Sequence, residues 1–337
     1  MLKQLTSLIT ILTLVANTAH AQAKLKVIKT FHIASPGGWD YLSINDDKLY
    51  VSHGTQVNIL NKTTGDSIGV VENTTGVHGI AFIPAIGRGY TSNGRLNNVS
   101  VFDLKTNEVL QQIATGQNPD AIMYEPFTKS IITCNGRSND LSVIDQETNA
   151  ITATIAVGGK PEEAASNGEG ILYVNLEDKN EIAVVDLKTM KVTNRFSLKG
   201  AEGPTGLGYD KLTKRLFAGC EKKLVIINAE SGEIVQTLPI GDGCDGVAFD
   251  AATQTIYTSN GVGTITVIKE LSANKFAIVE NVPSLPRGRT IALDPSTHMV
   301  YVPTAGFEPL PANAAKNEWP KMIPGSFKVL VLAEQGK

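Results

Sequence analysis

The sequence is poor in cysteine and tryptophan and has only one long apolar stretch. Its 337 residues include three cysteines and two tryptophans. Cys134, Cys220 and Cys244 are widely spaced, with no C-x-x-C pair, which excludes the usual zinc, iron–sulfur and c-type haem patterns. After residue 16 no segment approaches the roughly 18 consecutive apolar residues that a membrane-spanning helix needs. We therefore do not expect a transmembrane segment.

The sequence also has no excess of positive charge. It contains 30 Lys and Arg against 33 Asp and Glu, for a formal net charge of −3. Proteins that bind nucleic acid or anionic membranes usually present a basic patch. We therefore do not expect nucleic acid as a partner.

The N-terminus has the pattern of a secretory signal peptide. Lys3 precedes an apolar stretch from Leu5 to Ala16, and Ala19-His20-Ala21 forms an A-x-A cleavage site. The alternative is a buried N-terminal helix. The pattern predicts residues 1–21 as a signal peptide, and residues 22–337 as one domain of a periplasmic or secreted protein.

The segment Gly76–Asn118 shows how the remaining chain is organised. Short runs rich in Val, Ile, Tyr and Phe occupy Gly79–Ile83, Arg88–Ser92, Asn98–Asp103 and Val109–Ala114. Turn residues separate them, which favours four strands in an antiparallel meander. One meander cannot bury both of its faces alone, so similar neighbours are needed.

Seven segments repeat the start of this unit. The matched positions are Asp40, His78, Asp120, Glu162, Thr205, Asp245 and Arg289, with spacings of 38, 42, 42, 43, 40 and 44 residues. Seven units of about 40 residues with four strands each predict an all-β, seven-bladed β-propeller.

The termini are expected to close the ring. Phe327–Leu332 matches the third strand of the other units, and the five residues after it are too few for a fourth. Lys24–Ala34 reads as a strand with no partner before it. We predict that this N-terminal strand is the outer strand of the last blade, which removes an exposed edge and favours a monomer.

Several motifs support a family resemblance that covers the whole mature chain. They are LYVSHG, YTSNGRLNNVSVFD, ITCNGRSNDLSVID, LYVNLEDKNEIAVVD and IYTSNGVGTITVI. These segments resemble the YVTN-repeat (YncE-like) β-propeller family. The resemblance implies an exported seven-bladed propeller but no single activity. The DNA binding linked to this family is not carried over, because this chain is acidic.

Strand direction places most distinctive polar residues on one face of the disc. The crossovers between blades and the turns between second and third strands share that face. We predict that they line a ligand-binding funnel made of Asp40, His53, His78, Asn93, Arg95, Asp120, Asn135, Arg137, Glu162, Glu163, Asn175, Asp245, Arg287 and Arg289. The alternative for each residue is capping of turn amides or contact with water.

One long insertion emerges on the same face. Gly306–Ser326 separates the second and third strands of the last blade and carries four prolines and Trp319. A long non-repeat loop over a pocket suggests a lid or a wall, and a packed cap without ligand contact is the alternative.

A divalent metal is the one non-protein group that these residues suggest, and no other cofactor is predicted. His53 and His78 can approach each other and, with Asp40 or Asp120, would offer mixed nitrogen and oxygen ligands. No local spacing enforces such a site. If the exported protein has a disulfide, Cys220 and Cys244 are the expected pair, with Cys134 a small buried side chain.

Two apparent catalytic or cofactor motifs are turn glycines. Gly65–Gly69 fits G-x-S-x-G and Gly241–Gly246 fits G-x-G-x-x-G. A strand is predicted after each of them, whereas a nucleophile elbow or a dinucleotide site requires a helix there.

Two functions stay open on this evidence. One is a binding or scaffold protein whose funnel accepts a small polar molecule, a peptide or a partner protein. The other is a hydrolase or lyase, for example a lactonase, that uses the same funnel with or without metal. Quinone-dependent dehydrogenation is disfavoured by the shortage of tryptophan. The fold cannot decide between the two.

Overall fold

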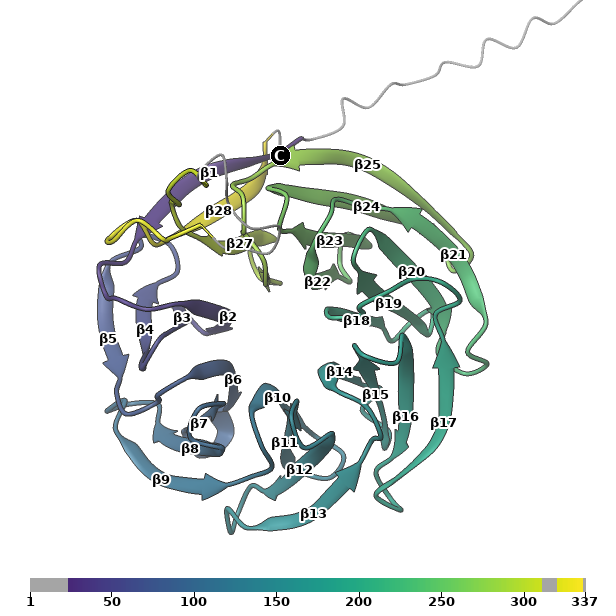
Figure 1. The fold of residues 1–337 in the computed structure, drawn as a ribbon, viewed down its shortest axis with the longest axis horizontal. Coiled ribbons are helices and arrows are strands. Elements are labelled where there is room, and N and C mark those ends of the chain that lie inside the picture. The colour runs from purple at the N-terminus through teal and green to yellow at the C-terminus, as the bar shows by residue number, and fades with distance from the viewer. Residues whose placement is uncertain (1–23, 311–319, 336–337) are drawn as a thin grey trace, which may run out of the picture.

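The computed structural model describes residues 24–310 and 320–335. These residues form seven four-stranded antiparallel sheets arranged in a ring around a central channel (Figure 1). The predicted seven-bladed β-propeller is confirmed. No helix of the described residues is long and apolar enough to cross a membrane.

Each blade runs from an inner to an outer strand. Blade 1 contains β2 (Trp39–Asn45), β3 (Lys48–His53), β4 (Gln56–Asn61) and β5 (Ser67–Val71). Blade 2 contains β6 (Val77–Ile83), β7 (Arg88–Asn93), β8 (Asn98–Asp103) and β9 (Val109–Ala114), with the short 3₁₀ helix η1 (Pro84–Ile86) after β6. Blade 3 contains β10 (Pro119–Glu125), β11 (Ser130–Asn135), β12 (Asp140–Asp145) and β13 (Ile151–Ala156). Blade 4 contains β14 (Pro161–Ser166), β15 (Ile171–Leu176), β16 (Glu181–Asp186) and β17 (Lys191–Ser197).

The remaining blades follow the same order. Blade 5 contains β18 (Leu207–Asp210), β19 (Arg215–Cys220), β20 (Lys223–Asn228) and β21 (Ile234–Pro239). Blade 6 contains β22 (Cys244–Asp250), β23 (Thr255–Asn260), β24 (Thr264–Ser272) and β25 (Lys275–Pro283). Blade 7 contains β26 (Ala292–Asp294), β27 (Met299–Thr304), β28 (Lys328–Gln335) and β1 (Lys24–His32).

The N-terminal strand closes the ring as predicted. β1 pairs antiparallel with β28, from Lys24 opposite Gln335 to His32 opposite Lys328. The side chain of Phe31 on β1 is 4% exposed and packs in a core shared by blades 7 and 1. The terminal strand therefore protects the edge of β28 and buries apolar area at once.

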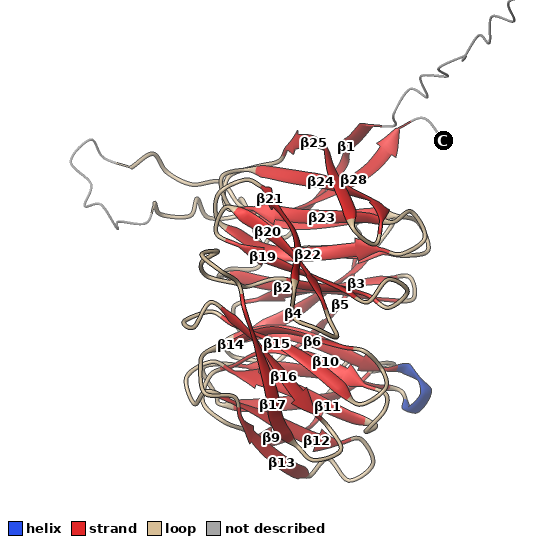
Figure 2. Ribbon diagram, turned by 90° about the vertical axis from the view of Figure 1, so that its right-hand side faces the viewer, coloured by secondary structure: helices blue, strands red, loops and turns tan. Residues whose placement is uncertain are grey.

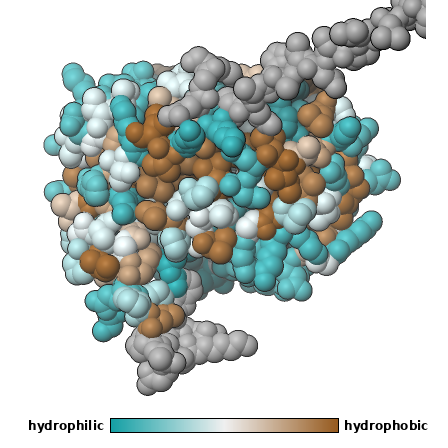
Figure 3. Space-filling view, turned by 90° about the horizontal axis from the view of Figure 1, so that it is seen from above, coloured by the Kyte–Doolittle hydropathy of each residue, from teal (hydrophilic) through white to brown (hydrophobic). Residues whose placement is uncertain are grey.

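The two middle strands of each blade are buried because a neighbouring blade covers each of their faces. In β3, Leu49, Tyr50 and Val51 are fully buried, whereas Leu110 on the outer strand β9 is half exposed. Strands covered on both faces read as continuous apolar runs, and this is why the second and third strands of the repeat align so clearly. At the rim, apolar and hydrophilic residues lie side by side without one uniform apolar face (Figure 3).

Tyrosines of the second strands connect some blades to the next one. Tyr90 of blade 2 donates a hydrogen bond to Asn149 Oδ1 of blade 3 at 3.3 Å. Tyr173 of blade 4 donates to the carbonyl of Ala229 in blade 5 at 3.1 Å, and Tyr301 of blade 7 donates to a carbonyl of blade 1 at 3.0 Å. Each ring is buried while its hydroxyl group is satisfied, so this tyrosine both packs and orients the blade interface.

The turns between third and fourth strands are local structures, as the sequence indicates. The carboxylate of Asp103 accepts hydrogen bonds from the amides of Lys105 and Thr106 at 2.9 and 3.0 Å. Asn107 then takes a left-handed conformation with φ of 64°. Such Asx turns depend only on neighbouring residues, so they carry no information about function.

The expected Cys220–Cys244 disulfide is not present. Both thiols are free and buried, as is Cys134. Cys220 Sγ hydrogen-bonds to the carbonyl of Ala218, and Cys244 Sγ to that of Gly246, each at 3.8 Å. Each sulfur thus contacts its own strand, and the two cysteines act as small buried side chains.

Closure of the ring by β1 can be tested by mutation. Phe31→Ala removes a buried ring between blades 7 and 1, so we expect a loss of about 3–5 kcal/mol in the free energy of unfolding. Thr30→Ala changes an exposed side chain of the same strand and should cost less than about 0.5 kcal/mol. Urea unfolding measures both. Equal effects would show that β1 does not hold the ring closed.

Candidate functional site

The first residues of the inner strands meet around one end of the central channel. Asp40 lies on β2, His78 on β6, Asp120 on β10 and Asp245 on β22, whereas Arg289 precedes β26. Figure 1 shows β2, β6, β10 and β22 as the innermost strands of the ring. Positions about 40 residues apart in the chain are therefore brought together by the ring.

Hydrogen bonds between blades hold these strand starts in place. Thr290 Oγ1 donates to the carbonyl of Asp40 at 2.6 Å, Ser43 Oγ to that of Ile80 at 2.7 Å, and Thr205 Oγ1 to that of Cys244 at 2.8 Å. In each case one blade donates to the next. The small hydroxyl side chains stabilise the backbone, whereas the acidic side chains beside them are partly exposed.

His78 lies between two carboxylates. Its Nδ1 is 2.5 Å from Asp40 Oδ2 and 3.7 Å from Asp120 Oδ1. Burial alone would lower the pKa of His78, but the hydrogen bond with Asp40 and the charges of both carboxylates raise it to about 9. His78 is therefore an imidazolium at neutral pH. Burial and the charge of Asp40 raise the pKa of Asp120.

Arg289 and Lys160 provide the other positive charges. Arg289 Nε is 3.3 Å from Asp245 Oδ2, and its Nη2 is 3.8 Å from Asp40 Oδ1. Lys160 Nζ is 2.7 Å from Glu162 Oε1 and also contacts Glu177. Burial and the charge of Asp120 nevertheless raise the pKa of Glu162. We call these side chains the channel-mouth cluster: Asp40, His78, Asp120, Lys160, Glu162, Glu177, Asp245 and Arg289.

The channel-mouth cluster is acidic. It holds five carboxyl groups but only three cationic side chains, and Asp120, Glu162 and Asp245 each feel the charge of other carboxylates. Burial and incomplete compensation of these three groups raise their pKa values. The cluster can therefore accept further positive charge by releasing protons from them.

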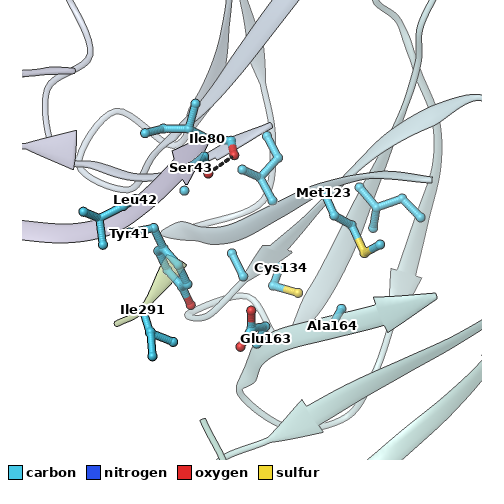
Figure 4. Close-up of a pocket in the computed structure, with 13 residues that line it drawn as sticks. Tyr41, Leu42, Ser43, Ile80, Met123, Cys134, Glu163, Ala164 and Ile291 are labelled. Atoms are coloured by element: carbon cyan, nitrogen blue, oxygen red, sulfur yellow. Dashed lines mark hydrogen bonds between the residues drawn. The ribbon is translucent and has the colours of Figure 1, made fainter. Parts of the chain in front are cut away.

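A cavity also lies beside the inner strands. It has a volume of about 150 Å³, and Tyr41, Cys134, Glu163 and Ile291 are among its lining residues. Figure 4 shows the side-chain oxygens of Tyr41 and Glu163 pointing toward one another. Burial raises the pKa of Glu163 to about 8 although the amide of Leu207 donates to its Oε2 at 2.8 Å. Glu163 is therefore largely a neutral acid at pH 7.

Four predicted funnel residues are structural instead. Asn93 and Asn135 are fully buried, and each donates through Nδ2 to side chains of the adjacent third strand. Asn175 donates to the carbonyls of Thr205 and Gly206 in blade 5. Their side chains connect strands rather than face a ligand, because buried amides need hydrogen-bond partners.

His53 is the fourth of these residues, and the structure does not bring it to His78. It is fully buried, with Nδ1 at 2.6 Å from Ser35 Oγ and Nε2 at 2.9 Å from the carbonyl oxygen of Gly37. Burial lowers its pKa. Both ring nitrogens are engaged, which corrects its assignment as a funnel residue and candidate metal ligand.

The three arginines of the turns differ from one another. Arg95 and Arg137 are exposed, and neither forms an ion pair with a residue that the structure describes. Arg287 lies over the ring of Phe307, with Cζ at 5.1 Å from the ring centre. Arg95 and Arg137 are therefore surface charges on the face that was predicted to bind a ligand, whereas Arg287 packs on an aromatic side chain.

Sequence comparison of the repeats overlooked several residues near the channel. Lys160 stands in the segment KPEEAA, one proline before the two glutamates, and Tyr41 directly follows Asp40. Both are departures from the repeat at an inner-strand start, a signal that was present in the alignment. Phe307 carried no comparable signal, because it lies in the insertion of blade 7 and only the fold brings it into contact with Trp39 of blade 1.

The raised pKa values predict that stability falls with rising pH. The folded protein holds protons on Glu163 up to pH about 8 and on His78 up to about 9, whereas the unfolded chain releases them near the ordinary pKa values of 4.5 and 6.5. Their contributions are complete below those unfolded values and are lost through pH 8–9. We expect a lower melting temperature at pH 9 than at pH 6.

Glu163→Gln should flatten this pH profile. The amide oxygen can still accept from Leu207, and the variant carries no charge to bury, so we expect a melting temperature at pH 9 about 2–4 °C above that of the wild type. Glu169→Gln, an exposed control, should leave the profile unchanged. If the melting temperatures of Glu163→Gln and the wild type depend on pH in the same way, Glu163 is not the neutral buried acid that we assign.

Comparisons with known proteins support the fold. No family model and no curated protein sequence matches the chain. Among solved structures, it is similar to Kuenenia stuttgartiensis hydrazine synthase, with a TM-score of 0.71, 18% identity, and coverage of 80% of this chain and 94% of that chain. At this identity the similarity shows the fold alone. The chain is a seven-bladed β-propeller, and its resemblance to the YVTN-repeat family rests on its sequence motifs.

Proposed function

We propose that this protein is an exported, non-catalytic binding propeller that takes up a small, positively charged polar ligand at the channel-mouth cluster. The observation that carries the proposal is the excess of partly buried carboxylates over cationic side chains. Asp40, Asp120 and Asp245 keep 13%, 16% and 25% of their side-chain surface exposed. They are near enough to solvent to meet a ligand and sufficiently desolvated to favour one that brings positive charge.

The rigidity of the ring supports binding rather than chemistry. The inner strands are connected by hydrogen bonds between blades, so the carboxylates are held in place before a ligand arrives. Preorganisation lowers the entropic cost of binding. The N-terminal signal pattern and the YncE-like motifs favour an exported location, and a charged segment of a peptide or partner protein would suit the same surface.

Calorimetric titration with diaminobutane tests this proposal. We expect saturable binding with release of protons, because the ammonium group lowers the pKa values of the neighbouring carboxyl groups. Butanediol, which has the same chain without charge, should not bind. Asp120→Asn should weaken diaminobutane binding about tenfold, since one charge-assisted contact is lost.

Arg95→Ala is the matched control for that titration. It changes an exposed charge on the same face outside the channel-mouth cluster, and binding of diaminobutane should stay within a factor of about two. Equal binding of the diol and the diamine would refute the proposal, and so would an unchanged affinity in Asp120→Asn.

A second candidate function, a metal-assisted hydrolase or lyase, is favoured by one observation. Single ligand atoms of Asp40, His78 and Asp120 lie within 4.8 Å of one another. One imidazole nitrogen and two carboxylate oxygens suit a divalent transition metal, and such a metal would have to displace the proton that His78 holds in the metal-free protein. A metal bound there would act as a Lewis acid on a substrate oxygen.

Metal analysis distinguishes this candidate from simple cation binding. If it is correct, protein purified without a metal-affinity step contains close to one metal per chain, and His78→Gln loses it. His32→Gln, an exposed histidine on β1, should retain it. Metal-free wild-type protein that also takes up none on dialysis against zinc, manganese or cobalt would rule out the metal-assisted function.

A further inference from the structure

A second cavity on the same end of the propeller differs in chemistry from the channel mouth. It has a volume of about 250 Å³ and is lined by Gly38, Trp39, Arg287, Arg289 and Phe307. None of these five described lining residues is acidic. Two aromatic rings and two guanidinium groups therefore face one space.

The aromatic wall of this cavity is built on a continuous stack. The ring of Trp39 stacks on Phe327 with centres 5.0 Å apart, and Phe327 stacks on His53 at 4.2 Å. His53 is in turn held by Ser35 and the carbonyl of Gly37. The buried histidine that the sequence suggested as a ligand thus fixes the orientation of Trp39.

The base of the blade-7 insertion provides the other ring. Phe307 forms an isolated β-bridge with Met322, Glu308 N donates to Lys321 O at 2.8 Å, and Ile323 N donates to Gly306 O at 2.9 Å. Phe307 lies 6.1 Å from Trp39, centre to centre. Figure 2 shows the described ends of this insertion leaving the disc on the face opposite η1. The part of the predicted insertion that the structure describes thus contributes a wall; Trp319 and the rest of 311–319 lie outside the described residues.

The two arginines approach the cavity from one short segment. Arg287 has a left-handed backbone with φ of 63°, and its amide donates to the carbonyl of Gly261 at 2.7 Å. This turn places Arg287 over Phe307, whereas Arg289 reaches the channel mouth.

The charges at this cavity favour an anion. Burial and then the nearby charge of Arg289 lower the pKa of Arg287. Burial alone would also lower the pKa of Arg289, but the charges of Asp245, Asp40 and Asp120 raise it. A carboxylate beside Arg287 would relieve the repulsion that Arg287 experiences, and it could form charge-assisted contacts with both guanidinium groups. Trp39 and Phe307 offer apolar surface to a planar group attached to the carboxylate.

We propose that this cavity binds a small aromatic carboxylate. Its carboxylate lies against Arg287 and Arg289, and its ring packs on Trp39 and Phe307. The site goes beyond the proposed cation binding and does not depend on it, because Trp39, Arg287 and Phe307 lie outside the channel-mouth cluster. Arg289 is the one residue that the two sites share among those that the structure describes.

Fluorescence of Trp39 reports occupancy directly. The chain has two tryptophans, Trp39 and Trp319, so the Trp319→Phe variant leaves a single reporter. In this background we expect benzoate to change the Trp39 emission saturably. Benzyl alcohol, which has the ring without the charge, and acetate, which has the charge without the ring, should each bind at least about tenfold more weakly.

Substitutions place the benzoate on these residues. Arg287→Gln keeps a non-glycine residue at the left-handed position, and it should weaken benzoate binding about tenfold. Phe307→Leu should weaken it several-fold by removing ring contact. Arg95→Gln, outside both this cavity and the channel-mouth cluster, should bind benzoate as the parent does, and circular dichroism melts verify that every variant is folded.

Three results would overturn the proposal. The first is that benzoate and benzyl alcohol change the Trp39 emission equally. The second is that Arg287→Gln and Arg95→Gln weaken benzoate binding equally, and the third is that folded protein shows no saturable response to benzoate. Diaminobutane binding, measured on the same protein, shows separately whether the channel-mouth proposal fails. Diaminobutane and Asp120→Asn test the channel mouth, whereas benzoate and Arg287→Gln test the aromatic cavity.

Discussion

Each blade of this propeller covers the faces of its neighbours, and none can be removed without exposing two apolar surfaces. The middle strands are buried on both sides, and the outer strand of blade 7 comes from the opposite end of the chain. A ring of sheets has no free face only when it is closed. Pairing of β1 with β28 therefore does more than protect one edge, since it holds the surfaces of blades 7 and 1 together.

Closure also creates the polar environment at the channel. Seven inner strands begin at one end, and side chains that are remote in the chain meet there at hydrogen-bonding distance, as His78 and Asp40 do. The same convergence takes carboxylates partly out of water, which raises the pKa values of Asp120, Glu162 and Glu163. Structural rigidity and an unusual charge distribution thus have one origin, the packing of blades around a narrow axis.

The two proposed sites are neighbours, and their side chains carry charges of opposite sign. The channel-mouth cluster has an excess of carboxylates, whereas the neighbouring cavity has two guanidinium groups and two aromatic rings. Arg289 stands between them and pairs with Asp40 and Asp245. The aromatic cavity exists because the insertion departs from the repeat and brings Phe307 onto Trp39 of the next blade. Departures from the repeat are thus where this scaffold acquires specific chemistry.

The sequence alone determined the number of blades, the four strands of each unit, the turn types and the closing strand. These features depend on local periodicity and on neighbouring residues, as the Asx turn at Asp103 illustrates. It also located Asp40, His78 and Asp120 at equivalent strand starts. Only the tertiary structure decided that Asn93, Asn135, Asn175 and His53 are buried structural residues, that Cys220 and Cys244 are not bonded to each other, and that Trp39, Arg287 and Phe307 line one cavity. The reason is physical: burial, hydrogen-bond partners and pKa values depend on contacts between blades, which local sequence patterns do not encode.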